Sequence, residues 1–295
     1  MRVGMIGLGN IGSQVANNLV ADRHEVWVHD VDPKRAESVT GATVAESVEA
    51  VGASTELTVL SLPTPAVVRT VAERWATSAT AGSILVDLST NSPQVVRELG
   101  ARLATSGHRL VEAPLTGGAI GAERRQLMFM LGGDDEDVER VRPVLDPLGR
   151  ATFHLGPLGS GNTMKLVNSL LAFTSTWVSL EGLSLASKSG IGVQQAVEVL
   201  RTGGAGNFFI DRLVEGIDQR GRPTQFALEL AAKDAALFVE IGDDLGVPIP
   251  VGDAVRGVLD DAVEAGLGES DWSELVVAAE HRGDVELRWD PTTAE

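Results

Sequence analysis

The chain has 295 residues, 43% of them hydrophobic and 22% charged, and a formal net charge of −17 at pH 7. This length and composition suit one large or two moderate globular domains, and they exclude a disordered, a collagen-like or a small disulfide-stapled protein. The acidic balance would repel a phosphate backbone or an anionic membrane, so neither nucleic acids nor membranes are expected as partners. The lack of cysteine removes disulfides, thiolate metal sites and thiol catalysis, and no metal site is predicted.

The N-terminal segment is typical of a first strand rather than of a signal peptide, because glycines interrupt its short apolar run. A cytoplasmic location is therefore expected. The most apolar long segment, residues 166–185, carries polar side chains such as Asn168 and Glu181, whereas a bilayer span needs about 20 predominantly apolar residues. This segment is predicted to be a buried central helix.

Up to about residue 155, short runs rich in β-branched residues alternate with amphipathic helical segments. The predicted strands cover residues 3–6, 25–29, 57–62, 84–88, 110–112, 127–131 and 152–154. Ser92 followed by Pro93, and Asp134 followed by Asp135, indicate two helix starts. Strands that alternate with helices imply right-handed crossovers, so we predict an α/β fold with a Rossmann-type, doubly wound and mostly parallel sheet.

After the glycine-rich segment 156–161 the pattern is helical throughout, with Gly or Pro breaks near residues 190, 203–206, 221–223 and 246–250. A helix of roughly 28 residues is predicted to start there and to link two domains. We therefore expect a dinucleotide-binding domain over residues 1–160 and an all-helical substrate-binding and oligomerisation domain over residues 161–295. Apolar helices at 180–185 and 228–239 favour a homodimer or homotetramer.

A glycine motif, Gly7-Leu8-Gly9-Asn10-Ile11-Gly12, directly follows the first predicted strand and opens the first helix. In the dinucleotide-binding fingerprint, Gly7 makes the tight turn, Gly9 lets the backbone approach a pyrophosphate, and Gly12 lets the helix pack on the sheet. The pyrophosphate then lies at the positive end of the helix. The less favoured alternative is a tight turn that binds no ligand.

Asp30 closes the second predicted strand, where a carboxylate binds the adenine-ribose diol and repels a 2′-phosphate. Two unit charges about 4 Å apart repel by roughly 1 to 4 kcal/mol, depending on the dielectric, so NAD is favoured over NADP. Lys34 and Arg35 lie just downstream and could neutralise a 2′-phosphate, which keeps NADP open.

Two further loops, Leu62-Pro63 and the segment from Asp87 to Thr90, follow the ends of predicted strands. Ligands of parallel sheets bind beyond the carboxyl ends of the strands, so both loops are predicted to line the cofactor cleft. Ordinary capped strand-to-helix loops explain the same residues equally well.

The next strand runs into Thr116-Gly117-Gly118, which offers a hydroxyl and freely oriented backbone N–H groups. Such a loop suits a carboxylate, although a merely flexible glycine loop is the alternative.

Lys165 and Asn168 lie three residues apart at the start of the long helix, so they share one helix face. Burial and the positive end of the helix dipole would both lower the pKa of Lys165, toward a value useful for proton transfer. A surface lysine with no chemical role is the alternative. Lys233 and Asp234 lie in a predicted helix over 226–241, where adjacent residues are not expected to form a salt bridge on the helix face, and a solvated charge is equally open.

These motifs together resemble the β-hydroxyacid dehydrogenase family, of the 3-hydroxyisobutyrate dehydrogenase and tartronate semialdehyde reductase type. The resemblance covers nearly the whole chain, down to Asp271-Trp272-Ser273. It implies that Lys165 is the catalytic lysine, that residues 116–118 and Asn168 bind the substrate, and that Thr90 and Lys233 contact the cofactor. Thr116 replaces a usual Ser, and Arg124-Arg125 makes a bulkier, more cationic rim than the family usually has.

The resulting prediction is an NAD(P)-dependent oxidoreductase that interconverts a short, anionic β-hydroxy acid and its semialdehyde or keto form. Imine reductases look similar but typically lack the lysine. 6-Phosphogluconate dehydrogenase also looks similar, but it has a His-Asn pair after its lysine and a larger second domain. A non-catalytic dinucleotide-binding module is the alternative from another class.

Overall fold

The computed structural model describes residues 1–289 and divides the chain into two compact units, Met1–Leu166 and Val167–Glu295. The predicted boundary at residues 160/161 stays a prediction, and residues 290–295 of the predicted second domain lie outside the described residues. No helix among residues 1–289 is long and apolar enough to cross a membrane.

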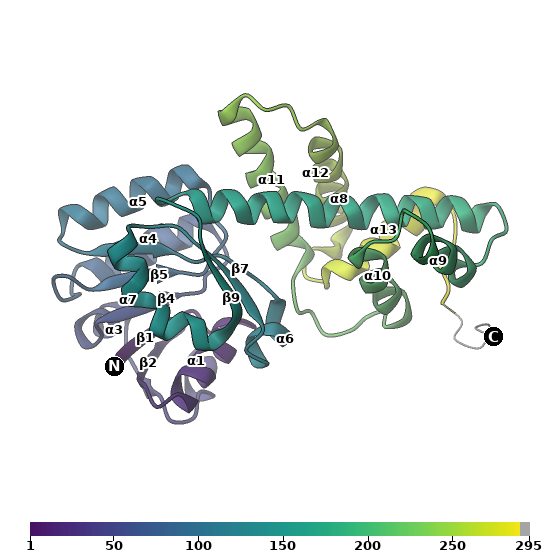
Figure 1. The fold of residues 1–295 in the computed structure, drawn as a ribbon. Helices are drawn as coiled ribbons and strands as arrows, with labels where there is room; N and C mark the ends of the chain where they lie inside the picture. The colour runs from purple at the N-terminus through teal and green to yellow at the C-terminus, as the bar shows by residue number, and fades with distance from the viewer. Residues whose placement is uncertain (290–295) are drawn as a thin grey trace. The chain divides into compact units, whose positions relative to one another are not determined.

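A six-stranded sheet in the order β3-β2-β1-β4-β5-β6 forms the centre of the first unit, and every pairing in it is parallel (Figure 1). The strands are β1 (Arg2–Ile6), β2 (Glu25–His29), β3 (Thr43–Val44), β4 (Leu57–Leu60), β5 (Ile84–Asp87) and β6 (Arg109–Glu112). This is the strand order of a doubly wound dinucleotide-binding fold. The predicted Rossmann-type architecture is confirmed.

Helices pack on both faces of the sheet, so the side chains of a strand, which point alternately to the two faces, are buried on both. In β1, Val3 and Met5 join a cluster with α1 and α7, whereas Ile6 joins a second cluster with α3, α4 and α5. The helices of this unit are α1 (Gly12–Ala21), α2 (Pro33–Glu37), α3 (Val48–Ser54), α4 (Pro65–Ala76), α5 (Pro93–Thr105), α6 (Gly118–Glu123) and α7 (Asp135–Leu145), followed by a short 3₁₀ turn (Asp146–Leu148). Helices α5 and α7 begin where the sequence indicated.

A second, three-stranded sheet was not expected. It consists of β7 (Leu115–Thr116), β8 (Leu127–Leu131) and β9 (Gly149–His154), and β7 is antiparallel to β8. The sequence analysis missed β3 and β7, because a two-residue strand has no periodicity to detect.

Helix α8 (Ser160–Lys188) is one continuous element of 29 residues and confirms the predicted long helix (Figure 1). The described part of the second unit, residues 167–289, contains helices and no strand. After α8 come α9 (Val193–Thr202), α10 (Phe208–Asp218), α11 (Leu228–Leu245), α12 (Pro250–Ala262), a π turn (Val263–Leu267), a 3₁₀ turn (Trp272–Glu274) and α13 (Leu275–Gly283). The breaks after α8, α9, α10 and α11 fall at the predicted Gly and Pro positions, whereas the interruption between α12 and α13 was not predicted.

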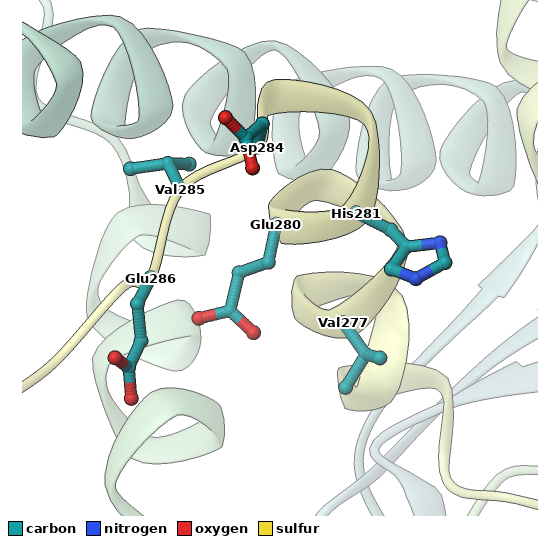
Figure 2. Close-up of a pocket in the computed structure, with 6 residues that line it drawn as sticks. All are labelled: Val277, Glu280, His281, Asp284, Val285 and Glu286. Atoms are coloured by element: carbon teal, nitrogen blue, oxygen red, sulfur yellow. The ribbon is translucent and has the colours of Figure 1, made fainter.

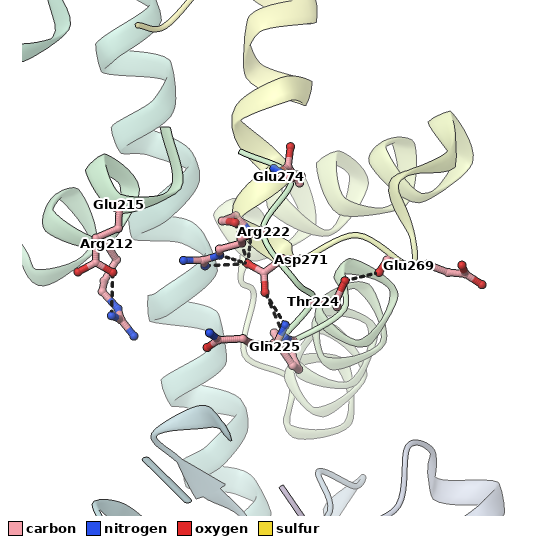
Figure 3. A network of polar contacts seen from close by, with 11 residues as sticks. Arg212, Glu215, Arg222, Thr224, Gln225, Glu269, Asp271 and Glu274 are labelled. Carbon is pink, nitrogen blue, oxygen red and sulfur yellow. Dashed lines mark hydrogen bonds and ion pairs between the residues drawn. The ribbon is translucent and has the colours of Figure 1, made fainter. Parts of the chain in front are cut away.

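Asp271 organises the loop between α10 and α11 (Figure 3). Its buried carboxylate accepts hydrogen bonds from the Arg222 guanidinium at 2.7 Å, the Gln225 N–H at 2.9 Å and the Ser273 hydroxyl at 2.7 Å. Burial alone would raise the pKa of Asp271, but these donors outweigh it and hold the pKa below its usual value. The Asp271-Trp272-Ser273 motif therefore has a local structural role.

The apolar helices that led us to expect an oligomer are mostly buried within the chain. Leu180, Leu183 and Leu228 are fully buried, because these helices pack on their neighbours in the second unit. A different face of α8 is exposed instead, at Leu171, Val178 and Leu185, which follow one another at seven-residue intervals. Such spacing places the three side chains on one stripe of the helix.

Candidate active site

The glycine motif lies between the end of β1 and the start of α1. Gly7 adopts a φ of 88°, and a Cβ atom there would collide with the Ser61 carbonyl oxygen. A Cβ atom on Gly12 would collide with the Gly7 carbonyl oxygen, so both positions require glycine for the fold itself. A Cβ atom on Gly9 would meet nothing within 4 Å. No contact within the described residues therefore requires a glycine at position 9.

Asp30 is held against the glycine motif. Its carboxylate accepts hydrogen bonds from the backbone N–H of Leu8 at 2.6 Å and from that of Asp32 at 2.8 Å. The structure thus brings together the two parts of the dinucleotide fingerprint. Helix α1 has no side-chain hydrogen bond at its N-cap, Ile11. An uncapped helix start, with open space beside Gly9, fits the pyrophosphate of a dinucleotide.

The loops after β4 and β5 are also tied together. The Leu62 N–H donates to the Ser89 hydroxyl at 2.9 Å, and the Ser89 N–H donates to the buried Asp87 carboxylate at 2.9 Å. Pro63 follows Leu62, and Thr90 stands between Ser89 and Asn91. Both predicted cofactor loops therefore begin at the carboxyl ends of two neighbouring strands, β4 and β5.

Glu112, the last residue of β6, caps the start of α8. Its fully buried carboxylate accepts hydrogen bonds from the backbone N–H groups of Gly159 at 2.5 Å, Gly161 at 2.9 Å and Asn162 at 3.1 Å, and from the Asn162 side-chain amide at 2.6 Å. A Cβ atom on Gly132 would collide with this carboxylate, so the Glu112 side chain packs directly against the backbone of Gly132.

Two buried carboxyls share this network. Burial and, to a smaller extent, the negative charge of Glu112 raise the pKa of Asp87 to about 6, against the hydrogen bonds from Ser89 and Asn91. Burial also raises the pKa of Glu112, against its four N–H donors. All four partners of Glu112 are donors, which is the arrangement that an ionised carboxylate needs.

This cap corrects one of our arguments about Lys165. We expected the positive end of the helix dipole to act on its ammonium. Lys165 instead follows the first residue of α8, Ser160, by five positions, and the dipole acts mainly within the first turn. The Glu112 carboxylate also offsets the positive charge of that helix end. Lys165 itself is half-buried.

The predicted substrate loop makes a sharp turn into α6. Thr116 pairs with Met128 in the second sheet, and Gly117 and Gly118 have φ values of 122° and 63°. Two consecutive positive values place backbone N–H groups in directions that other residues rarely allow. The Thr116 side chain is half-buried.

The expected cationic rim beside this loop is smaller than predicted. The Arg125 guanidinium donates to both carboxylate oxygens of Asp22, the residue after α1, at 2.8 and 2.9 Å, and to the Asn18 carbonyl oxygen at 3.2 Å. Arg125 therefore links the segment after α6 to the C-terminal end of α1. Arg124 is the exposed member of the pair.

In the second unit, α8 and α11 are linked beside two predicted site residues. Ser169, next to Asn168, donates to the Asp234 carboxylate at 3.4 Å. Lys233 forms an ion pair with Asp234, with 3.0 Å between Nζ and Oδ1, which contradicts our expectation that these neighbours would not pair. The long lysine side chain folds back to reach Asp234, whose buried charge needs a partner.

A pocket on the second unit contains none of the predicted site residues (Figure 2). It is lined by Val277, Glu280, His281, Asp284, Val285 and Glu286. Two of its carboxylates pair with cations, Glu280 with Arg220 at 2.7 Å and Asp284 with Lys188 at 3.0 Å. Throughout residues 1–289, no cluster of three His, Asp or Glu side chains could hold a metal ion.

The sequence analysis gave no role to Glu112 or to Asn162. The available signal was an acidic residue that closes an apolar strand, a pattern shared by Asp30, Asp87 and Glu112. A charge in that position must find donors, and its partners lie far away in the sequence.

Two family models match the chain over most of its length. Residues 2–156 match the NAD binding domain of 6-phosphogluconate dehydrogenase, and residues 159–279 match the family described as NAD-binding of NADP-dependent 3-hydroxyisobutyrate dehydrogenase. The chain belongs to the β-hydroxyacid dehydrogenase family. It is accordingly an NAD(P)-dependent dehydrogenase or reductase, which confirms the resemblance of its motifs.

Individual members of the family are similar to this dehydrogenase over most of its length. The 2-(hydroxymethyl)glutarate dehydrogenase of Eubacterium barkeri is 28% identical over 94% of both chains. A probable 3-hydroxyisobutyrate dehydrogenase of Mycobacterium tuberculosis is 32% identical over 70% of both chains. A solved structure of a Mycobacterium tuberculosis 3-hydroxyisobutyrate dehydrogenase with L-serine has a TM-score of 0.86 and 26% identity, and it covers 94% of this chain and 98% of that one.

Proposed function

We propose that this dehydrogenase interconverts a short, anionic β-hydroxy acid and its semialdehyde or keto form, with Lys165 as the general acid and base. The observation that carries the proposal is the position of Lys165. It is half-buried on α8, shortly after a helix start that a buried carboxylate holds in place. A group that transfers a proton must be held within hydrogen-bond reach of the reacting oxygen, and a capped helix start provides a rigid support.

The bound nicotinamide supplies the hydride chemistry. During oxidation the neutral Lys165 Nζ accepts the proton of the substrate hydroxyl, and during reduction the Lys165 ammonium donates a proton to the oxygen. Asn168 orients that oxygen. The hydroxyl of Thr116 and the backbone N–H groups of Gly117 and Gly118 bind the substrate carboxylate. Asn168 and the loop of residues 116–118 contribute to the rate mainly by positioning the substrate.

We further propose NAD as the preferred cofactor. The pyrophosphate binds at the glycine motif, and Asp30, already fixed by two backbone N–H groups, accepts hydrogen bonds from the ribose diol. Arg35 lies 3.8 Å from the Asp32 carboxylate, which offsets its charge toward a 2′-phosphate. Leu62, Pro63, Thr90 and Lys233 are the remaining proposed cofactor contacts.

The test of the lysine compares Lys165→Ala with Lys188→Ala, which removes another lysine from the same helix. We expect Lys165→Ala to lose at least 95% of kcat, because no other group replaces the proton acceptor, while the Kd for NADH, from fluorescence titration, changes less than about threefold. Lys188→Ala should keep the wild-type kcat, since Lys188 pairs with the exposed Asp284. A Lys165→Ala enzyme that keeps more than a few per cent of kcat would contradict the assignment.

A substrate screen addresses the chemistry and the alternatives. We would measure steady-state turnover of 3-hydroxyisobutyrate, glycerate, serine and 4-hydroxybutyrate with NAD and with NADP, and the reduction of cyclic imines alongside. Turnover of a β-hydroxy acid with NAD supports the proposal. Imine reduction alone would favour an imine reductase, and NADH binding without any turnover would favour a non-catalytic module.

We also propose that the protein forms a homodimer or homotetramer through the exposed stripe on α8. Leu171 is 60% exposed and Leu185 is 73% exposed, a large apolar surface for one helix. Leu171→Glu with Leu185→Glu should lower the mass measured by light scattering. Leu245→Glu, at a residue that is 66% exposed on α11, is the matched control and should leave it unchanged. A wild-type monomer at micromolar concentration would refute the proposal.

A further inference from the structure

A continuous chain of buried hydrogen bonds joins the loop after β5 to the start of α8. From the Asp87 carboxylate it passes to the Asn91 side-chain amide at 2.6 Å. The Asn91 backbone N–H then donates to Asn162 Oδ1 at 2.7 Å, and Asn162 Nδ2 donates to Glu112 Oε2 at 2.6 Å. Asn91 and Asn162 are 1% and 0% exposed, so water does not replace these bonds.

Asn162 is the member of this chain that links two separate parts of the first unit. Its side-chain oxygen holds the loop of residues 89–91, and its side-chain nitrogen holds Glu112. Thr90 lies in that loop, between two residues whose backbone N–H groups are both bound. Lys165 follows Asn162 by three positions in α8 and therefore lies on the same side of the helix.

We propose that Asn162 is a positioning residue, which fixes the first turns of α8, and with them Lys165, relative to the loop that carries Thr90. The proposal rests on the proposed function, in which Thr90 contacts the cofactor and Lys165 transfers the proton. Proton transfer depends steeply on the separation and alignment of the reacting groups, so a small displacement of α8 lowers turnover without removing any group that binds a ligand.

The substitution Asn162→Ala separates positioning from folding. The backbone N–H groups of residues 159, 161 and 162 still cap α8 through Glu112, because none of these bonds uses the Asn162 side chain. The loop of residues 89–91 also keeps its bonds to Asp87. The variant loses only the link between the two parts.

The experiment measures kcat, KM for the hydroxy acid and the Kd for NADH of Asn162→Ala. Thr163→Ala is the matched control, because Thr163 is the next residue in the same turn and its hydroxyl donates a local hydrogen bond to the Gly159 carbonyl oxygen, at 2.7 Å. We expect kcat of Asn162→Ala to fall at least tenfold, with KM and Kd within about threefold of wild type. Thr163→Ala should keep kcat within twofold.

Hydrogen exchange at the Asn91 amide reports the broken link directly. We expect faster exchange of the Asn91 backbone N–H in Asn162→Ala than in the wild type and in Thr163→Ala, because this N–H loses its acceptor, Asn162 Oδ1. A variant with faster exchange but an unchanged kcat would show that Asn162 has only a structural role, and the proposal would fail. Should Asn162→Ala not fold, Asn162→Ser is the second variant, and faster exchange at the Asn91 backbone N–H together with an unchanged kcat would be equally decisive there.

The two proposals fail in different ways. An active Lys165→Ala enzyme overturns the proposed function and the positioning role with it. An inactive Lys165→Ala enzyme together with a fully active Asn162→Ala enzyme overturns the positioning role alone.

Discussion

Two helix starts in the first unit, those of α1 and α8, show opposite solutions to the same physical problem. The first N–H groups of any helix have no partner inside the helix. At α1 the side chain of the N-cap residue, Ile11, makes no capping hydrogen bond, and the space beside Gly9 is open. At α8 the protein supplies its own anion, the buried Glu112 carboxylate. The uncapped start is thus suited to a ligand's phosphates, and the capped start is suited to holding Lys165, the acid and base of our proposal, in a fixed position.

The largest effect should follow from removing the internal anion. Glu112→Ala leaves three backbone N–H groups and the Asn162 amide buried without their acceptor, at about 1 to 3 kcal/mol for each unpaired group before relaxation. We expect a loss of about 4 kcal/mol or more in the free energy of unfolding, measured with urea. Asp30→Ala, which removes a half-buried carboxylate from the α1 end, should cost only about 1 kcal/mol. Equal losses would contradict the contrast between the two helix starts.

The second prediction separates two glycines of the α1 start. Gly12→Ala places a Cβ atom against the Gly7 carbonyl oxygen and should cost about 3 kcal/mol of folding stability. Gly9→Ala meets no protein atom, so thermal unfolding should stay within about 2 °C of wild type. We nevertheless expect its Kd for NADH to rise at least tenfold, because the backbone can no longer approach the pyrophosphate. Wild-type NADH affinity in Gly9→Ala would argue against a phosphate at this position.

The smallest effect concerns the pH dependence of the network around α8. The pKa of Asp87 is about 6 in the folded protein, against about 4 in an unfolded chain. The folded state then holds more protons than the unfolded state between those values, so this group makes stability fall as pH rises from about 4 to 6. The loss is at most about 3 kcal/mol, because one pKa unit corresponds to 1.36 kcal/mol.

Asp87→Asn removes this titration and provides the measurement. The Asn91 Oδ1 atom accepts no hydrogen bond within the described residues, so a flip of the Asn91 amide can accommodate the new side-chain NH₂ group. Relative to wild type, the variant should gain stability in urea unfolding as pH rises from 4.5 to 7. A difference that stays constant over this range would show that the Asp87 carboxyl does not titrate there.

Much of the fold was predictable because its signals are local. The six-residue glycine motif lies between a strand and a helix, and the helix starts at Pro93 and Asp135 follow short capping patterns. The long α8 helix was predictable from its period and from the glycines before it. The strands β3 and β7 were missed because two residues of extended backbone depend on a neighbouring strand for their hydrogen bonds.

The predicted site residues divide in the same way. Residues 7–12 and Asp30 could be read together because each lies at the end of a strand or the start of a helix. The pair of Lys233 and Asp234 was misjudged, because the burial of Asp234 depends on which helix covers it. Arg125 was assigned to a rim by its charge, whereas its partner Asp22 lies about a hundred positions earlier in the chain.

The sequence by itself determined the doubly wound α/β unit, the helical second unit and the family, since periodicity, turn glycines and motif order are properties of short segments. Only the tertiary structure decided how α8 begins. Glu112 lies 47 to 50 positions before the N–H groups that it caps, and Asn162 lies 71 positions after the backbone that it holds. No local sequence pattern encodes such pairs. They are selected by the cost of burying a carboxylate and an amide without hydrogen-bond partners, and this cost arises only when folding brings the end of β6 and the start of α8 together.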